Sequence, residues 1–221
     1  MTTPAFRVLF ACTGNLCRSP AAEIITRHLL KDRQGDRCSG FELASAGTDA
    51  IPDREIATFT GAALSALGLG AEARAFRARR LDAEMTGKAD LVLTAERAHR
   101  RAAVTLAPAA LRRTFTIREF ARLLMDVERP PGADPAERAR TAVLLAHRRR
   151  GTRGHVPGEL DAIEDPIRLP RAAHHATIER ITQSMEIFVE FIAGATMTGQ
   201  DRNNTGELLD PVKRFPPSPV G

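Results

Sequence analysis

A cysteine and an arginine, Cys12 and Arg18, stand six positions apart directly after the apolar run Val8–Ala11. A cysteine thiolate is a strong nucleophile, and a guanidinium can hold two oxygens of a phosphoryl group through parallel hydrogen bonds, which a lysine cannot do. The pair therefore predicts attack by sulfur on a phosphate ester. The spacing alone is weak evidence, because an arginine-rich chain places some arginine six residues after a cysteine by chance.

The residues between and after this pair strengthen the prediction. Gly14 permits a tight turn, and Asn15 tolerates the left-handed backbone conformation. Such a turn can direct successive amide N–H groups inward, forming an anion nest at a helix start that also stabilises an ionised Cys12. Ser19 is expected to cap this helix, with Pro20 in the first helical position, and its hydroxyl could stabilise the leaving sulfur. A buried structural cysteine before an ordinary helix would explain neither the Gly-Asn pair nor the arginine.

An acid must protonate the leaving group, and the same group can later deprotonate water. Asp165 in the segment 162–166 is the candidate, because Pro166 favours a stiff, extended backbone at the preceding residue. Glu164 and, more weakly, Asp161 remain alternatives.

Short apolar strand patterns alternate with helical patterns along the chain. Strands are predicted at Arg7–Ala11, Glu42–Ser45, Leu91–Thr94 and Thr114–Ile117, and helices at 20–34, Arg54–Leu67, Glu96–Val104, Glu119–Met125 and Ala172–Ala193. This order predicts an α/β fold, a three-layer sandwich whose four-stranded parallel sheet is flanked by helices. Ligands bind such sheets beyond the carboxyl ends of the strands, where Cys12 and its phosphate-binding loop follow the first strand.

One domain is expected over residues 1–198, because 221 residues suit a single core. Chain-breaking prolines and a change of composition mark an insert at about 127–158, in which Ala136–Arg150 is expected to form an exposed Arg/Ala-rich helix. Residues 199–221 are expected to be a flexible tail.

The composition excludes several classes of function. The net charge is +5, yet no nucleic-acid-binding motif is present, and Arg148–Arg150 and Arg153 are expected to be a solvated loop or helix end. No run suits a membrane helix or a signal peptide, which predicts a cytoplasmic protein without a membrane partner. The three cysteines and six histidines lack metal-site spacing, so we expect no metal and no other cofactor.

The segment Cys12–Pro20, CTGNLCRSP, closely resembles the phosphate-binding loop of the low-molecular-weight protein tyrosine phosphatases. The likeness covers roughly residues 5–125 and 160–193 and includes Glu23, Ser45–Thr48, Leu91–Thr94 and Asp165-Pro166. It implies a phosphomonoesterase, specifically a protein-tyrosine-phosphatase, that acts on a phosphotyrosine protein or a small aryl phosphate through a phosphocysteine intermediate.

The resemblance also implies roles for individual residues. Cys12 would be the nucleophile, Arg18 the phosphate clamp and Asp165 the general acid and base. Ser45 would support Asn15. The remaining loop residues would bind or support the phosphate: Thr13, Gly14, Asn15, Leu16, Cys17 and Ser19. Cys17 could form a protective disulfide with the nucleophile or simply be a packed small side chain, and both interpretations stay open. Cys38 has no evident partner.

The chain also departs from the family pattern. Ile167 and Arg168 stand where many relatives carry tyrosines, which leaves the preference for phosphotyrosine over other aryl phosphates open.

Thiol-dependent arsenate reduction is one alternative function, but it needs downstream resolving cysteines, and nothing after Cys38 can serve. A non-catalytic phosphate-binding regulatory module is another, disfavoured because nucleophile, arginine and acid are all present. The sequence does not indicate an oligomeric state.

Overall fold

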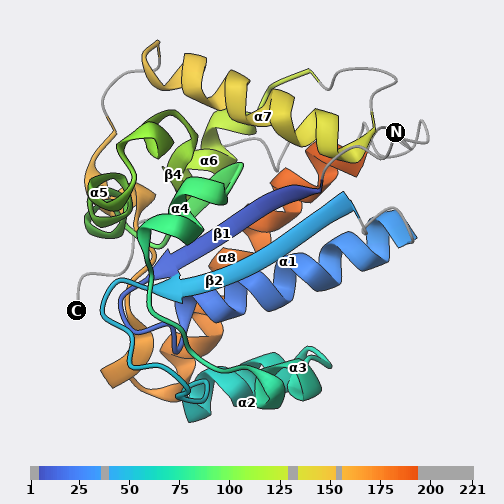
Figure 1. Ribbon diagram of the computed structural model, residues 1–221. Helices are drawn as coiled ribbons and strands as arrows, with labels where there is room; N and C mark the ends of the chain where they lie inside the picture. The colour runs from blue at the N-terminus through green and yellow to red at the C-terminus, as the bar shows by residue number, and fades with distance from the viewer. Residues whose placement is uncertain (1–4, 36–39, 129–133, 153–155, 194–221) are drawn as a thin grey trace.

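The structure of the protein, a computed structural model, describes residues 5–35, 40–128, 134–152 and 156–193. Its centre is a four-stranded parallel sheet in the order β2-β1-β3-β4 (Figure 1). The strands are β1 Phe6–Cys12, β2 Phe41–Gly47, β3 Leu91–Thr94 and β4 Thr114–Thr116. The helices are α1 Arg18–Gln34, α2 Thr58–Ala66, α3 Gly70–Ala75, α4 Ala83–Lys88, α5 Arg97–Leu106, α6 Ile117–Leu124, α7 Pro135–Arg150 and α8 Arg171–Ala193.

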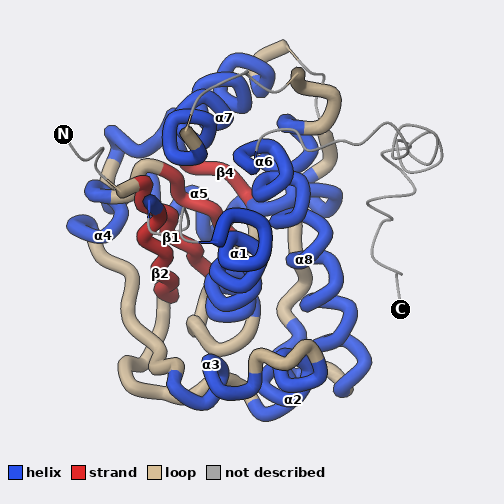
Figure 2. The backbone as a smooth tube through the Cα atoms, turned by 90° about the vertical axis from the view of Figure 1, so that its right-hand side faces the viewer, coloured by secondary structure: helices blue, strands red, loops and turns tan. Residues whose placement is uncertain are grey.

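Helices cover both faces of the sheet, which confirms the predicted α/β sandwich. Figure 2 shows α1, α6 and α8 on one side of the strands and α4 on the other. Side chains of a strand alternate between faces, and accordingly Val8 and Phe10 of β1 join the large core around α1, α6 and α8. Leu9 and Ala11 join a smaller cluster that includes Ala103 of α5. The catalytic candidates therefore follow a strand that is buried on both faces.

The four strands lie where the apolar patterns predicted them, and β3 has the predicted bounds. The second helix begins at Thr58 rather than Arg54. The preceding segment is instead held by backbone hydrogen bonds, in which Asp53 N–H donates to Ala78 O and Ala78 N–H donates to Arg54 O, at 2.9 and 2.8 Å. The short helices α3 and α4 were not predicted.

The predicted helix at Ala136–Arg150 is present, but the expectation that it is exposed is wrong. Helix α7 packs against α6 and α8 and buries a row of small side chains. The buried apolar residues are Ala136, Ala139, Ala142, Val143 and Ala146. They recur at the three- and four-residue spacing of one helical face. The sequence did not predict this buried face, because alanine is only weakly apolar and many arginines lie between the alanines.

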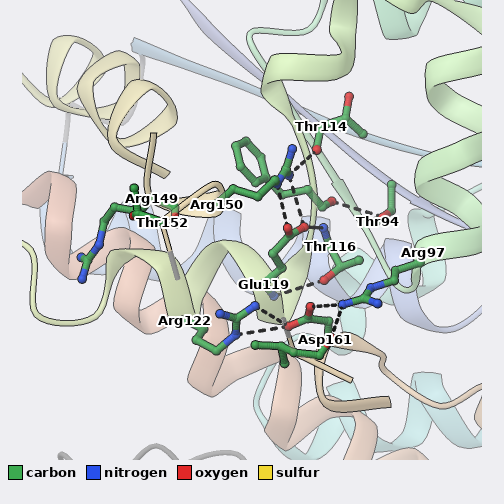
Figure 3. Close-up of polar contacts among 12 residues, drawn as sticks. Thr94, Arg97, Thr114, Thr116, Glu119, Arg122, Arg149, Arg150, Thr152 and Asp161 are labelled. Carbon is green, nitrogen blue, oxygen red and sulfur yellow. Dashed lines mark hydrogen bonds and ion pairs between the residues drawn. The ribbon is translucent and has the colours of Figure 1, made fainter. Parts of the chain in front are cut away.

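The end of α7 is also not the solvated arginine cluster that was expected. Arg150 Nε donates to Glu119 Oε1 of α6 at 2.8 Å, and Nη2 donates to Thr114 O at 2.8 Å (Figure 3). The guanidinium carbon lies 4.0 Å from the centre of the Phe115 ring. Burial lowers the pKa of Arg150. Arg149 Nη1 also donates to Met125 O at 2.9 Å, whereas Arg148 is exposed. The last turn of α7 is therefore tied to the rest of the fold through two of its arginines.

The expected tail at 199–221, Cys38 and Arg153 lie outside the described residues, and the domain boundary at 198 stays a prediction. In the part of the chain that the structure describes, none of the helices combines the length and apolarity needed to cross a bilayer.

Replacing Arg150 with alanine should destabilise the fold. The change leaves the Glu119 carboxylate, whose side chain is 9% exposed, without its ion pair, and it removes the stacking on Phe115. We expect the free energy of unfolding to fall by about 2 kcal/mol in a urea titration. Arg148→Ala is the control and should change it by less than about 0.5 kcal/mol. Equal effects of the two substitutions would contradict the anchoring role of Arg150.

Candidate active site

A pocket of about 150 Å³ opens beyond the carboxyl end of β1. Six residues of the predicted loop line the pocket together with two residues from the segment before α8. The lining residues are Cys12, Thr13, Gly14, Leu16, Cys17, Arg18, Asp165 and Ile167. Asn15, Ser19 and Ser45 are buried behind this lining. The structure thus brings every predicted site residue to one place, as expected for a parallel sheet.

The nucleophile candidate Cys12 is the last residue of β1, and its Sγ lies 2.9 Å from Ser19 Oγ. Ser19 is not the helix cap that was predicted. The helix begins two residues earlier than expected, at Arg18, with Cys17 in the capping position and no side-chain capping bond. The serine hydroxyl is free to contact the sulfur because it is not engaged with the helix backbone N–H groups.

The loop carbonyls are held outward by backbone donors from outside the loop, at 2.9 to 3.0 Å. The donor and acceptor pairs are Thr48 N–H to Cys12 O, Asp49 N–H to Thr13 O, and Ala57 N–H to Leu16 O. In a planar trans peptide the N–H points opposite to the carbonyl. The amides that follow these carbonyls, those of Thr13, Gly14 and Cys17, are therefore directed to the inner side of the loop, as an oxyanion cradle requires.

Asn15 has a φ of 55°, so it adopts the left-handed conformation that its residue type predicted. Gly14 does not have a positive φ, and an added Cβ would only reach Leu16 at an ordinary 3.6 Å. The sterically required glycine is Gly47 at the end of β2, where a Cβ would lie 2.4 Å from Thr13 O and 2.8 Å from Asn15 N. The loop thus depends on a close approach to the neighbouring strand.

The side chain of Asn15 holds the loop from behind. Its Nδ2 donates to Ser19 Oγ and Ser45 Oγ, at 2.9 and 3.0 Å, and its Oδ1 accepts from Arg79 N–H at 2.9 Å. Ser45 in turn donates to Glu23 Oε2 at 2.7 Å. Sequence reasoning placed Ser45 behind Asn15, but it did not find the backbone contact with Arg79.

Arg18 is a buried cation, with only 2% of its side chain exposed. Its Nη2 donates to Asp165 Oδ2 at 2.6 Å and to Thr13 Oγ1 at 3.2 Å, and its Nη1 donates to Ile163 O at 3.1 Å. Its Nε is buried and has no hydrogen-bond partner among the described residues. A buried donor without a partner is costly, and Arg18 lines the pocket in which an oxyanion would bind.

The three acidic candidates occupy different environments. Asp165 lines the pocket, 38% exposed, and directly contacts Arg18. Glu164 is exposed. Asp161 is buried and forms ion pairs with Arg97 and Arg122. Among the described residues, no group of three or more histidine, cysteine or acidic side chains is placed to hold a metal ion.

His99 contacts the phosphate-binding loop, and the sequence analysis did not predict this residue at the site. Its Nε2 lies 2.8 Å from Thr13 Oγ1, the same hydroxyl that accepts from Arg18. Burial, followed by the nearby Arg18 charge, lowers the pKa of His99 to about 4. The ring is therefore neutral near pH 7. The available signal was its position in the helix that follows β3, because β3 pairs with β1 and ends at the same edge of the sheet.

Cys17 is a free thiol that lines the same pocket as Cys12, which is also free. Burial raises the pKa of Cys17 to about 11, partly opposed by a hydrogen bond with Thr60. The side chain is thus a neutral thiol near pH 7. A disulfide with Cys12 stays a prediction.

Comparison with known proteins decides the family. The model of the family described as low molecular weight phosphotyrosine protein phosphatase matches residues 7–151. The chain belongs to this family. Its members are cysteine-dependent phosphatases, so the cysteine-based hydrolytic chemistry predicted from the loop is confirmed, and arsenate reduction is not favoured. Asp165 lies beyond the matched residues.

Individual relatives differ in the phosphorylated residue that their names specify. The chain is 35% identical over 115 residues to a protein-arginine-phosphatase of Geobacillus stearothermophilus, covering 52% of this chain and 71% of the relative. It is 36% identical over 104 residues to a low molecular weight protein-tyrosine-phosphatase of Streptomyces coelicolor, covering 47% of this chain and 60% of the relative. The crystal structure of such a tyrosine phosphatase from T. tengcongensis superimposes with a TM-score of 0.61 at 27% identity, covering 84% of this chain and 99% of that one.

The raised pKa of Cys17 predicts a thiol that resists alkylation. Only the thiolate reacts with iodoacetamide, and with a pKa of about 11 it forms on the order of one molecule in a few thousand at pH 7.5. In Cys12→Ser protein, peptide mapping by mass spectrometry should show little modified Cys17 at pH 7.5 and a steep rise above pH 10. Labelling at neutral pH as fast as that of free N-acetylcysteine would contradict the burial of this thiol.

Proposed function

We propose that the protein hydrolyses phosphorylated side chains of proteins, with phosphotyrosine as the favoured substrate, through a phosphocysteine formed on Cys12. The observation that carries the proposal is the pocket itself. A cysteine sulfur, inward amides and a buried arginine with an unpartnered Nε meet there beside a carboxyl group.

The proposed reaction has two displacements. The Cys12 thiolate attacks phosphorus, so that an S–P bond forms while the P–O bond to the leaving group breaks. Protonated Asp165 gives its proton to that oxygen. In the second step water attacks phosphorus, the S–P bond breaks, and Asp165 takes the proton of the water. Arg18 and the loop amides hold the equatorial oxygens throughout, and the Ser19 hydroxyl, 2.9 Å from the sulfur, stabilises the thiolate as it forms and leaves.

The walls of the pocket favour an aromatic substrate over phosphoarginine. Leu16 and Ile167 supply apolar surface against which a phenyl ring can lie. The N–H groups of a phosphoguanidine would instead need acceptors, and the one carboxylate of the pocket lining, Asp165, already accepts from Arg18. Phosphoarginine is the second candidate because of the similarity to the Geobacillus enzyme.

Substitutions at the two reacting residues test the chemistry. With p-nitrophenyl phosphate in EDTA, Cys12→Ser should abolish turnover while inorganic phosphate still binds. Asp165→Asn should lower kcat by about 100-fold with phenyl phosphate, because a general acid contributes at least that much to expulsion of a poor leaving group. Measurable turnover by Cys12→Ser would remove the nucleophile assignment.

The pH profile provides a separate check. The proposed reaction needs a thiolate as the nucleophile and a protonated carboxyl group as the acid, so the wild-type rate should depend on pH with a bell shape. Asp165→Asn should lose the alkaline limb. Undiminished activity in that variant would move the acid role to Glu164, since Asp161 is buried and does not line the pocket.

Two matched phosphopeptides distinguish the substrate classes. The same peptide sequence carrying either phosphotyrosine or phosphoarginine should give the higher kcat/KM with phosphotyrosine, by about tenfold or more if the ring is buried against the pocket wall. Replacing Leu16 with threonine should reduce this ratio, because it exchanges apolar wall for a polar hydroxyl. The opposite order of the two peptides in the wild type would make phosphoarginine the substrate.

A further inference from the structure

We infer that Asp161 is a positioning residue for catalysis, which fixes the loop presenting Asp165 and so sets the efficiency of proton transfer to the leaving group. The inference rests on the proposed function of Asp165 as general acid.

Both carboxylate oxygens of Asp161 are bound, each from a different helix (Figure 3). Arg97 of α5 donates from Nη2 to Oδ2 at 3.0 Å. Arg122 of α6 donates from Nη2 and Nε to Oδ1, at 2.9 and 3.3 Å. Asp161 is 2% exposed, whereas the Arg122 side chain is 20% exposed. A carboxylate held in this way from two sides cannot rotate without losing charged hydrogen bonds.

The next two residues of the chain are held as well. Arg118 Nη1 of α6 donates to Ala162 O at 3.1 Å. Ile163 N–H donates to Ala95 O, just after β3, at 2.8 Å, and Ile163 O accepts from Arg18 at 3.1 Å. Contacts from three parts of the fold therefore fix residues 161–163. Only Glu164 separates this fixed segment from Asp165, so the placement of the acid follows from it.

Charge explains why an acidic residue is needed at this position. Burial lowers the pKa of Arg118 to about 10, with Arg180 and Arg122 adding to the effect and Asp161 opposing it. Three arginines, at 97, 118 and 122, thus converge on this loop, and Asp161 ion-pairs with two of them. Without its negative charge the guanidiniums would repel one another and pull apart the contacts that hold the loop.

The position of Asp161 shows that it acts through Asp165 and not in its place. It does not line the pocket, and its oxygens are occupied by arginines. Loss of Asp161 should therefore affect the two steps that need Asp165, expulsion of the leaving group and activation of water, and should leave phosphate binding by the loop largely intact.

The test compares two substrates with different leaving groups. Phenol, with a pKa near 10, needs protonation far more than p-nitrophenol does. Hydrolysis of the phosphocysteine is common to both substrates, so the comparison uses kcat/KM, which reports the steps up to expulsion of the leaving group. For Asp161→Asn we expect kcat/KM with phenyl phosphate to fall about tenfold more than kcat/KM with p-nitrophenyl phosphate. The alkaline limb of the pH profile should also flatten, and inhibition by inorganic phosphate should change little.

A double-mutant cycle separates positioning from general destabilisation. If Asp161 acts through the proton of Asp165, then Asp161→Asn should cause no further loss with phenyl phosphate once Asp165→Asn is present. Independent effects would multiply. Arg122→Gln, which keeps the Arg97 contact with Asp161, should show the same substrate dependence in weaker form and provides the test if Asp161→Asn does not fold.

Glu119→Gln is the matched control. Glu119 also lies on α6 in an ion pair of similar burial, with Arg150 (Figure 3), but it forms no hydrogen bond or ion pair with residues 158–165. Glutamine can keep its capping contact with Thr116. The control should lower the midpoint of thermal unfolding without changing the ratio of the two substrates.

The outcomes are distinct. Equal losses with both substrates in Asp161→Asn, multiplicative losses in the double variant, or the same ratio change in Glu119→Gln would each overturn the positioning role while leaving the proposed function standing. An Asp165→Asn variant without any dependence on the leaving group would overturn the acid assignment, and the positioning role with it.

Discussion

The site depends on the burial of a single positive charge. Arg18 begins α1 and is almost fully enclosed, and an isolated buried cation is strongly unfavourable. Hydrogen bonds to Asp165, Ile163 and Thr13 offset the cost of burying this charge, and these residues come from the loop after β1 and from the loop before α8. One guanidinium therefore draws together the start of the chain and the loop before α8. Its unpartnered Nε leaves the compensation incomplete, in the way that a site for a transient anion requires.

A second constraint is the direction of the hydrogen bonds behind the nucleophile. An ionised Glu23 can only accept, so the Ser45 hydroxyl donates to it and must accept from Asn15. The amide of Asn15 then presents its Nδ2 to Ser19, whose oxygen accepts. The Ser19 proton is left for the Cys12 sulfur at 2.9 Å or, less favourably, for a carbonyl at 3.3 Å. Through Ser45 and Asn15, the Glu23 carboxylate thus orients the Ser19 hydroxyl toward the Cys12 sulfur.

The sequence predicted those features whose signal lies in the residue types at the position itself. The two-faced apolar run of β1 and the loop after it could be predicted, because the residue types at these positions signal a buried strand and a left-handed Asn15. Gly47 and His99 were not, since their importance arises from strand pairing that places Cys12 beside Gly47 and β3 beside β1. The start of α1 was misplaced because Ser19 resembles a cap in sequence while its hydroxyl is used by the nucleophile. Alanine burial in α7 left too weak an apolar signal.

Helix α6 connects the two regions that the sequence suggested were separate. Its Glu119 binds Arg150 at the end of α7, and its Arg118 and Arg122 bind the loop that carries Asp165. Ile117, Phe120 and Leu124 of the same helix are buried in the main core. A shift of α6 along its axis would therefore alter the packing of α7 and the acid loop together. The segment at 135–150 thus helps to fix the helix from which the acid is held, and its packing belongs to the architecture of the site.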